Sequence, residues 1–246
     1  MPVQPLEERL AVAFVELAGT LADDLEVGHV LQTLSECCVD LLDVSSAGVV
    51  LAGAPGDGPT SAGSDARARG LERDGVDWDE GPSRDCVRSG RSLEGVLLDH
   101  PDARTSWPRF SRRALELGFH SVTAVPLRLR NQVVGALTLF LDRAGTPADG
   151  RLGLGHALAD FAAIGILQRR ALHRQTLLTE QLETALQSRI LIEQAKGALA
   201  QRRQISVDEA FVLLRGHARS QRRRLSAVAQ EVLDGTTDLS SAESAE

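Results

Sequence analysis

The chain contains a single lysine, Lys196, and its other 26 basic residues are all arginine. An ammonium group is a compact, strongly hydrated point charge, whereas a guanidinium is a planar fork that binds carboxylates and phosphates through two parallel hydrogen bonds. Because arginine has taken every other basic position, the one lysine indicates a position that needs the chemistry of an ammonium. That position lies in the last fifth of the chain, within residues 192–199.

The charged residues are unevenly distributed along the chain. Residues 188–235 contain nine basic and five acidic residues, whereas residues 1–187 carry a net charge of −8. A basic segment on an acidic body is typical of a protein that meets a polyanion at one end only. Charge alone leaves open the alternative that this segment is a solvated basic face without a partner.

The composition indicates an ordinary globular protein. The 246 residues, 43% apolar and 25% charged, are enough for one large domain or two small ones. No apolar run approaches the roughly 20 residues of a membrane span, and the first residues lack the order of a signal peptide. Cys37, Cys38 and Cys86 have the spacing of neither a disulfide framework nor a metal site. We therefore expect a cytoplasmic protein with no metal site and no membrane contact.

Residues 1–147 show the pattern of an α+β domain. Two strands at 121–130 and 133–141 are joined by a short polar turn, in which Asn131 is expected to take the left-handed conformation. Residues 53–70, rich in Gly, Pro, Ser and Asp, are interpreted as a mobile loop that either covers a pocket or has no partner. The other predicted elements are helices at 6–21, 26–42, around Cys86 and at 107–117, and strands at 46–52 and 93–98. This order favours an antiparallel sheet with flanking helices.

A long helix is predicted from about residue 148 to Arg203, where the sequence contains no proline; it would be about 80 Å long. Apolar residues recur along it every seven positions, at Ile164, Ala171, Leu178, Ala185, Ile192 and Leu199. The other seam positions are mixed: Leu167, Arg174, Gln181, Ser188 and Ala195. The pattern predicts a parallel coiled-coil homodimer with a weak seam. Residues 148–187 would be the linker, with the last helix of the first domain continuing to about residue 167. The alternative is a helix that packs back on its own domain.

Residues 188–235 carry the signals of a small all-α module of three helices. Ser206 and Glu209 form a capping box at the start of the second helix. Ser226 is expected to cap the third helix, and Gly235 to end it. The second helix is expected to bury most of its apolar residues, which are Ala210, Phe211, Leu213, Leu214 and Ala218. Residues 236–246, with three acidic side chains, are expected to form a disordered tail.

This module resembles a known family. Residues 189–200, 205–215, 218–219 and 224–229 look like an ANTAR domain, the RNA-binding domain of transcription antiterminators. Upstream, Glu80-Gly81-Pro82, Trp107-Pro108-Arg109-Phe110 and the strand residues 125–129 and 135–140 are similar to the GAF domain of actinobacterial GAF–ANTAR proteins. In that group a cysteine often follows the Glu-Gly-Pro turn, and Ser83 stands in its place here.

The resemblance implies that a dimer of ANTAR modules binds paired stem-loops in a nascent leader transcript and so prevents a terminator hairpin from forming. RNA polymerase would be engaged only indirectly, and the protein would be a regulator rather than an enzyme. The GAF-like domain would sense an unidentified small ligand, and no cofactor is predicted.

Several side chains of the module suit RNA loops, which offer phosphates and splayed bases. The residues expected to contact RNA are Lys196, Arg202, Arg203, Phe211, Arg215, Arg219, Arg222 and Arg223. Lys196 and Arg219 are the strongest candidates. Phe211 stands at the family's aromatic position, where it would stack on a base, and its alternative is a role in the core alone. For some of the arginines at 222–224, the alternative to RNA contact is a solvated turn that only links two helices.

Three other functions are alternatives to RNA binding. A DNA-binding regulator with a ligand-sensing GAF domain is the main alternative, but the arginines are spread over three helices rather than gathered on one recognition helix. A sensor kinase with His173 as phosphoacceptor is disfavoured, because no acidic residue follows His173 and no glycine-rich ATP-binding module follows the long helix. In the third alternative, the GAF-like domain binds a small ligand and the rest of the chain only forms a dimer.

Overall fold

The computed structural model describes residues 5–22, 27–53, 58–148, 150–237 and 239. The chain divides into two compact units, one up to Ala171 and one from Leu172 onward, and a single helix, α7 (Arg151–Arg203), contributes to both. None of the described helices is long and apolar enough to cross a membrane.

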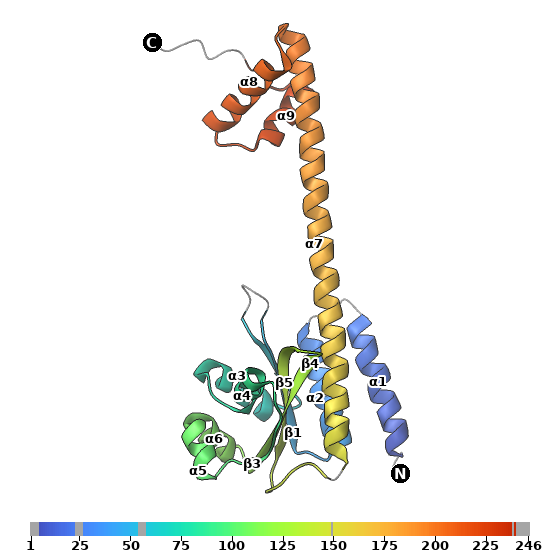
Figure 1. Cartoon of the computed structure of the whole chain (residues 1–246), viewed down its shortest axis with the longest axis vertical. Helices are drawn as coiled ribbons and strands as arrows, with labels where there is room; N and C mark the ends of the chain where they lie inside the picture. Colours follow the sequence, from blue (N-terminus) through green and yellow to red (C-terminus); the bar gives the residue numbers. More distant parts are fainter. Residues whose placement is uncertain (1–4, 23–26, 54–57, 149, 238, 240–246) are drawn as a thin grey trace. The chain divides into compact units, whose positions relative to one another are not determined.

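The N-terminal unit is built on a five-stranded antiparallel sheet in the order β2-β1-β5-β4-β3 (Figure 1). Its strands are β1 (Ser46–Leu51), β2 (Thr60–Gly63), β3 (Leu93–Leu97), β4 (Ser121–Leu129) and β5 (Gln132–Leu141). The predicted hairpin is confirmed by the pairing of β4 with β5. The residue with positive φ in its turn is Arg130, at φ 56°, so the prediction for Asn131 was wrong. The pairing of Leu129 with Gln132 leaves a two-residue turn, and it is the first turn residue that takes the left-handed conformation.

One face of the sheet is covered by α1 (Leu6–Ala22), α2 (Val27–Leu42) and the first part of α7. Alternate residues of the strands point to this face, as the period of two in a strand requires. Together with the helices they form the larger core, which includes Leu31, Leu34, Leu41, Val49, Leu137, Leu139, Leu158 and Ile166. The rings of Phe14 on α1 and Phe161 on α7 meet edge to face at 5.2 Å.

The opposite face carries α3 (Ala66–Trp78), α4 (Pro82–Ser89), α5 (Pro101–Ser106) and α6 (Pro108–Glu116), as Figure 1 shows. Phe119 and Phe140 stack there with ring centroids 4.7 Å apart. Phe110 of α6 is fully buried in the same cluster. The predicted α+β domain, with an antiparallel sheet and flanking helices, is thereby confirmed.

Residues 53–70 contain more structure than the mobile loop predicted for them. Strand β2 pairs with β1, placing Gly63 opposite Gly48, and α3 begins at Ala66; residues 54–57 lie outside the described residues. The small residues that gave the segment a loop-like composition have a packing role. A Cβ atom on Gly63 would lie 2.5 Å from the backbone nitrogen of Arg69, so only glycine allows β2 to approach α3 this closely.

Helix α3, which the sequence pattern did not reveal, is stabilised at its start by the residue that precedes it. Asp65 is the N-cap, and its carboxylate accepts hydrogen bonds from the backbone N–H of Ala68 at 2.8 Å and from the hydroxyl of Ser46 at 2.8 Å. We expect Asp65→Ala to lower the free energy of unfolding of this unit by about 1 kcal/mol. Urea denaturation followed by tryptophan fluorescence measures this. Asp77→Ala, which removes an exposed carboxylate from the same helix, is the control, and equal losses in both variants would contradict a capping role.

The C-terminal unit comprises the rest of α7 with α8 (Val207–Ser220) and α9 (Leu225–Asp234). The capping box of Ser206 and Glu209 is confirmed, as is the end of α9 at Gly235, which has φ 73°. The helices meet in a core made of Ala195, Leu199, Ala210, Leu214, Ala218, Val228, Ala229, Val232 and Leu239. The predicted disorder of residues 236–246 was wrong for Thr236 and Thr237, which hydrogen-bond Glu231, and for Leu239, which is buried in this core; residues 238 and 240–246 lie outside the described residues.

Two expectations for this unit were wrong. Ser226 does not cap α9, because the helix already begins at Leu225 and the carbonyl of Arg224 accepts its first hydrogen bonds, from the N–H groups of Ala227 and Val228. Leu199, the last position of the predicted coiled-coil seam, is only 3% exposed within its own unit. It packs on α8 and α9, so it has no surface left for a partner helix.

Candidate functional site

Lys196 and Phe211, both predicted to contact RNA, lie against each other in the C-terminal unit. The Lys196 ammonium lies 5.3 Å from the centroid of the Phe211 ring, within the range of a cation–π interaction. It also donates hydrogen bonds of 2.9 Å to both carboxylate oxygens of Glu193, one helical turn earlier on α7. The lysine side chain is therefore 15% exposed. Glu193 was not predicted as part of the site, although its i, i+3 spacing from Lys196 is a readable signal.

Three predicted arginines, Arg215, Arg219 and Arg222, form a row along the sequence, on α8 and in the turn that follows it. Arg215 and Arg219, four positions apart, lie on the same side of α8, whereas Arg222 follows the end of the helix and has φ 53°. All three side chains are exposed. None of the three forms a hydrogen bond or ion pair through its side chain with the part of the chain that the structure describes. Val212, which is 68% exposed, precedes Arg215 by three positions on this side. The row thus combines unneutralised cations with an apolar side chain.

Arg202 and Arg223 have partners within their own unit. Arg202 donates a 2.7 Å hydrogen bond to the carbonyl of Val232, near the end of α9. Arg223 pairs with Glu231, and its hydrogen bonds, followed by one from Thr237, lower the pKa of Glu231 to about 2. These two arginines hold α9 in place. Arg203, the eighth predicted contact, is half-buried and stands apart from the row on α8.

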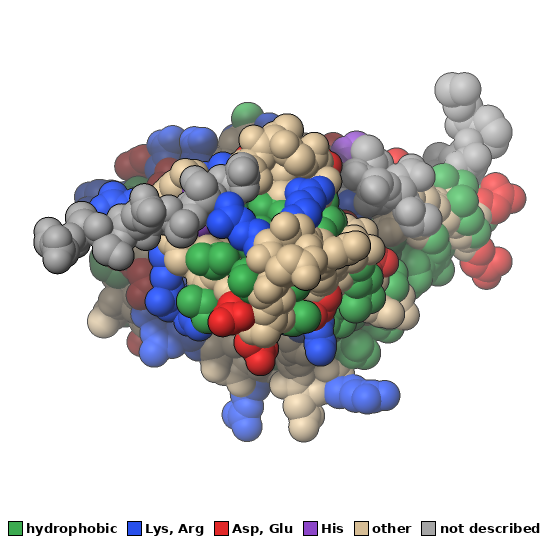
Figure 2. Space-filling model, turned by 90° about the horizontal axis from the view of Figure 1, so that it is seen from above, with side chains coloured by type: hydrophobic (Ala, Val, Ile, Leu, Met, Phe, Trp, Pro, Cys, Tyr) green, Lys and Arg blue, Asp and Glu red, His purple; other side chains and the backbone are tan. Residues whose placement is uncertain are grey.

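On the face shown in Figure 2, Lys and Arg side chains occur in several groups among apolar and uncharged ones. Within the C-terminal unit, the row of Arg215, Arg219 and Arg222, together with the pair of Lys196 and Phe211, is the best-defined candidate interface for a polyanion.

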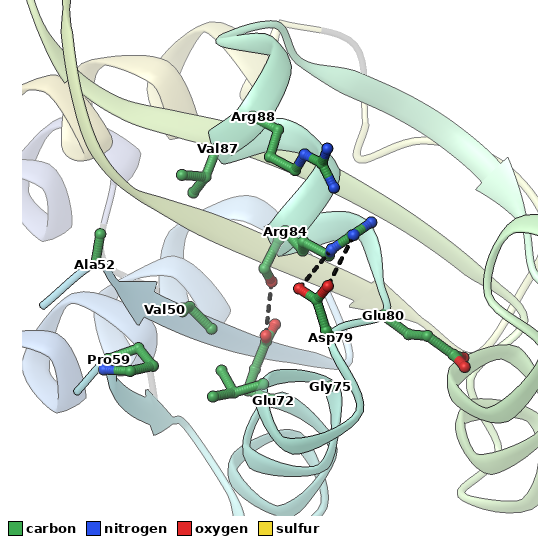
Figure 3. A pocket seen from close by; sticks show the side chains of 12 residues that line it. Val50, Ala52, Pro59, Glu72, Gly75, Asp79, Glu80, Arg84, Val87 and Arg88 are labelled. Atoms are coloured by element: carbon green, nitrogen blue, oxygen red, sulfur yellow. Dashed lines mark hydrogen bonds and ion pairs between the residues drawn. The ribbon is translucent and has the colours of Figure 1, made fainter.

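The N-terminal unit contains a cavity of about 250 Å³ between the sheet and helices α3 and α4 (Figure 3). Apolar side chains from several elements form much of its wall. The lining residues are Val50, Ala52, Pro59, Glu72, Gly75, Val76, Asp79, Glu80, Ser83, Arg84, Val87 and Arg88. Two of its charged residues already neutralise each other, because Arg84 forms a two-pronged ion pair with Asp79 at 2.6 and 2.8 Å. This pairing holds the pKa of Asp79 below its ordinary value.

Glu72 is the unusual residue of this cavity. It is 1% exposed, and its carboxyl group lies on the sheet beside Gly48, where a Cβ atom would come 2.9 Å from Oε1. Oε2 accepts a 2.6 Å hydrogen bond from Ser83, which is itself 2.7 Å from the hydroxyl of Thr138. Oε1 is buried and has no hydrogen-bond partner among the described residues. Burial raises the pKa of Glu72 to about 6.

Ser83, the residue that follows the Glu80-Gly81-Pro82 turn, thus supports this carboxyl group. No motif pointed to Glu72, because it lies on the helix that was not predicted. Burial raises the pKa of the Cys86 thiol to about 12 and that of Cys37 to about 11, so both stay protonated near neutral pH and are poor nucleophiles. No group of three His, Cys, Asp or Glu side chains is placed to hold a metal in the described ranges.

The two short motifs of the N-terminal half meet in the structure. Glu80 accepts hydrogen bonds from the backbone N–H groups of Arg109 and Phe110, at 2.9 and 3.2 Å, and so caps α6. Gly81 has φ 112°, and a Cβ atom there would lie 2.8 Å from the Phe110 ring. Glu80-Gly81-Pro82 and the segment from Trp107 to Phe110 therefore fasten α6 to the start of α4, close to the cavity. Their role is structural.

Two family models match the sequence. The model described as a GAF domain matches residues 24–167, more than half of the chain, and the model described as an ANTAR domain matches residues 180–233. No curated protein matches the sequence.

Solved structures resemble a large part of the chain. The GAF domain from a phosphoenolpyruvate-protein phosphotransferase of Coxiella burnetii is 15% identical, with a TM-score of 0.50 over 69% of this chain and 96% of that one. The GAF domain from the Acinetobacter phosphoenolpyruvate-protein phosphotransferase is 13% identical, with a TM-score of 0.47 over 69% of this chain and 97% of that one. At such low identity, the first likeness shows the fold alone.

Proposed function

The chain belongs to the GAF domain family and carries an ANTAR domain after its GAF domain, and from this premise we propose that it is a signal-responsive regulator that binds paired stem-loops in nascent leader RNA and prevents transcription termination. It acts in the cytoplasm as a homodimer, and RNA polymerase is affected only indirectly, through the transcript. The GAF domain perceives a small ligand, and α7 carries the signal to the ANTAR domain.

The arrangement of cations within the ANTAR match carries this proposal. Arg215, Arg219 and Arg222 offer three exposed, unneutralised guanidinium groups on α8 and in the turn after it, and each can fork onto a phosphate or stack on a base. Lys196 and Phe211 add a point charge and an aromatic face at one place. Single-stranded loops expose unstacked bases that suit such a combination, whereas a continuous DNA duplex offers no free base faces.

Exposed apolar side chains support dimerisation through α7. Leu178, Leu182, Leu186 and Ile190 follow one another at four-residue spacing and are 48–70% exposed. A stripe of this kind on a helix is normally covered by a partner, and a second copy of α7 supplies an identical stripe. The dimer would present two ANTAR domains together, which suits a pair of stem-loops.

The direct test is a titration of the purified full-length protein with fluorescently labelled tandem stem-loop RNA, at two salt concentrations, with duplex DNA of similar length as competitor. We expect tight binding that DNA does not reverse and that weakens as salt rises. Equal competition by DNA would instead indicate a DNA-binding regulator. An absence of RNA binding would refute the proposal.

Glu193 is expected to limit the affinity for RNA, because it occupies both the charge and the hydrogen bonds of Lys196. A phosphate that takes Lys196 must displace this carboxylate. We predict that Glu193→Gln raises the affinity for stem-loop RNA about threefold, in keeping with the modest strength of a partly exposed ion pair. Glu183→Gln, which removes an exposed acid from the same helix, is the matched control. If both variants gain equally, general charge and not the release of Lys196 is responsible.

A further inference from the structure

The cavity beside Glu72 differs from a passive packing defect in one respect. Glu72, which is 1% exposed, is one of its lining residues, and the Oε1 atom of its carboxyl group, buried beside Gly48, has no partner among the described residues. Buried charges in proteins are normally paired with an opposite charge, because leaving water without compensation is costly. Among the described residues, the side chains that contact the Glu72 carboxyl group offer hydroxyl groups, from Ser83 and Thr138, and no cation.

The other charged residues of the cavity already have partners or lie toward its mouth. Arg84 is bound to Asp79, and the side chains of this pair are 32% and 78% exposed. Glu80 caps α6. Arg88 is exposed, and its charge acts on Asp79. Figure 3 shows Arg84 and Arg88 side by side on α4, with Asp79 facing Arg84, while the Glu72 carboxyl group rises separately from α3. The inner end of the cavity is therefore acidic and the mouth is nearly balanced.

The walls between these groups are apolar. Val50 of β1, Val76 of α3 and Val87 of α4 line the space, and Gly75 adds backbone to the lining. The volume of about 250 Å³ lies just below the roughly 300–1,000 Å³ of sites for drug-sized molecules. A guest that fits must be small, with a short hydrocarbon body.

We propose that this cavity binds a small organic ammonium ion with a short branched or linear apolar chain, whose N–H group donates a hydrogen bond to Oε1 of Glu72. The ammonium supplies the missing charge and the missing donor at once, which a neutral molecule or an anion does not. The final torsion of a glutamate side chain is broad, so the carboxyl plane turns toward a donor at little cost. Binding of the ammonium ion does not depend on the proposed function; only its role as a regulatory signal rests on the proposed sensor role of the GAF domain.

A ligand in this site would change the hydrogen bond that positions α4. Ser83 lies at the start of α4 and is held by the same carboxyl group that would receive the ammonium. A guest that draws Glu72 toward the cavity changes the hydrogen bond that positions α4. The site therefore couples a bound cation to the helix that covers the sheet at β4 and β5.

Three compounds that share one apolar body and differ only in the head group test the proposal: 3-methylbutylamine, 3-methylbutan-1-ol and 3-methylbutanoate. Binding is measured by calorimetry on the full-length protein without RNA, near neutral pH. We expect the amine to bind at least about tenfold more tightly than the alcohol, since hydrogen bonds to charged groups are about twice as strong as neutral ones, and the carboxylate to bind least.

Glu72→Gln keeps the shape of the side chain and removes its charge. It should lower the affinity for the amine about tenfold and change that for the alcohol little. Glu94→Gln, an exposed acid of the same unit, should change neither. Ala52→Leu, at the edge of the cavity, should weaken both by filling space. Tighter binding of the carboxylate, equal binding of amine and alcohol, or no binding at millimolar concentration would each overturn the proposal. RNA is absent from this experiment, so a failure of amine binding would not argue against RNA binding. Likewise, a failure to bind RNA would not argue against amine binding.

Discussion

Replacing Arg215, Arg219 and Arg222 together with glutamine is expected to weaken the binding of tandem stem-loop RNA about a hundredfold and to lower the slope of log affinity against log salt by about two. Each arginine that neutralises a phosphate releases a counterion, and for single-stranded RNA each contact contributes about 0.7 to that slope. The three side chains, on α8 and in the turn after it, are exposed and, in the described part of the chain, are not engaged by acids. Nothing internal therefore competes with phosphate for them.

The control for this variant must remove the same charge from elsewhere. Arg104, Arg112 and Arg128 are exposed arginines of the GAF domain, and their joint replacement with glutamine should leave both the affinity and the salt slope within about twofold of the parent. Anisotropy titrations at several salt concentrations give both quantities. If the two triple variants weaken binding alike, net charge governs association and α8 is not the interface. If neither does, RNA is bound by another surface.

Periodic and capped elements were predictable from the sequence. The hairpin of β4 and β5 was predictable because two long β-branched and apolar runs flank a two-residue turn, and α8 because Ser206 and Glu209 mark its start locally. In both cases the determinant lies within a few residues along the chain. Helix α3 has only the single N-cap Asp65 as a local signal, and its composition is polar and includes two glycines. Gly75 faces the cavity and the Phe110 ring, which is a contact between distant segments.

The candidate interface was predicted in part. Residue type and a resemblance to a family identified the cations, but they did not separate Arg223, which binds Glu231, from Arg219, which is exposed. That distinction depends on how the turn after α8 brings Glu231 of α9 near Arg223, eight positions away. Glu72 was unpredictable for the same reason. Its environment is made by Gly48, Ser83 and Thr138, which are brought together only by the sheet and the two helices above it.

Glu72→Gln is expected to stabilise the GAF domain at about pH 8 by about 2 kcal/mol and to have almost no effect below pH 4.5. Burial raises the pKa of Glu72 from 4.5 to about 6. Below pH 4.5 the carboxyl group is protonated in both the folded and the unfolded protein, so burial carries no charge penalty. As pH rises through about 6, the folded protein must hold a buried carboxylate, and stability is lost. Glutamine is neutral throughout, and its carbonyl oxygen can still accept the hydrogen bond from Ser83.

The two tryptophans make this effect measurable in the GAF domain alone, because Trp78 ends α3 and Trp107 precedes α6, both within that domain. Urea denaturation followed by tryptophan fluorescence at several pH values then gives the free energy of unfolding of the domain that contains Glu72. The curves of parent and variant should separate as pH rises from 4.5 and run parallel above about pH 7. Glu94→Gln, the exposed control, should follow the parent throughout. If Glu72→Gln also follows the parent, the ionisation of Glu72 does not lower the stability of the domain. The buried Oε1 atom of Glu72 would then need a hydrogen-bond donor, which the described residues do not provide.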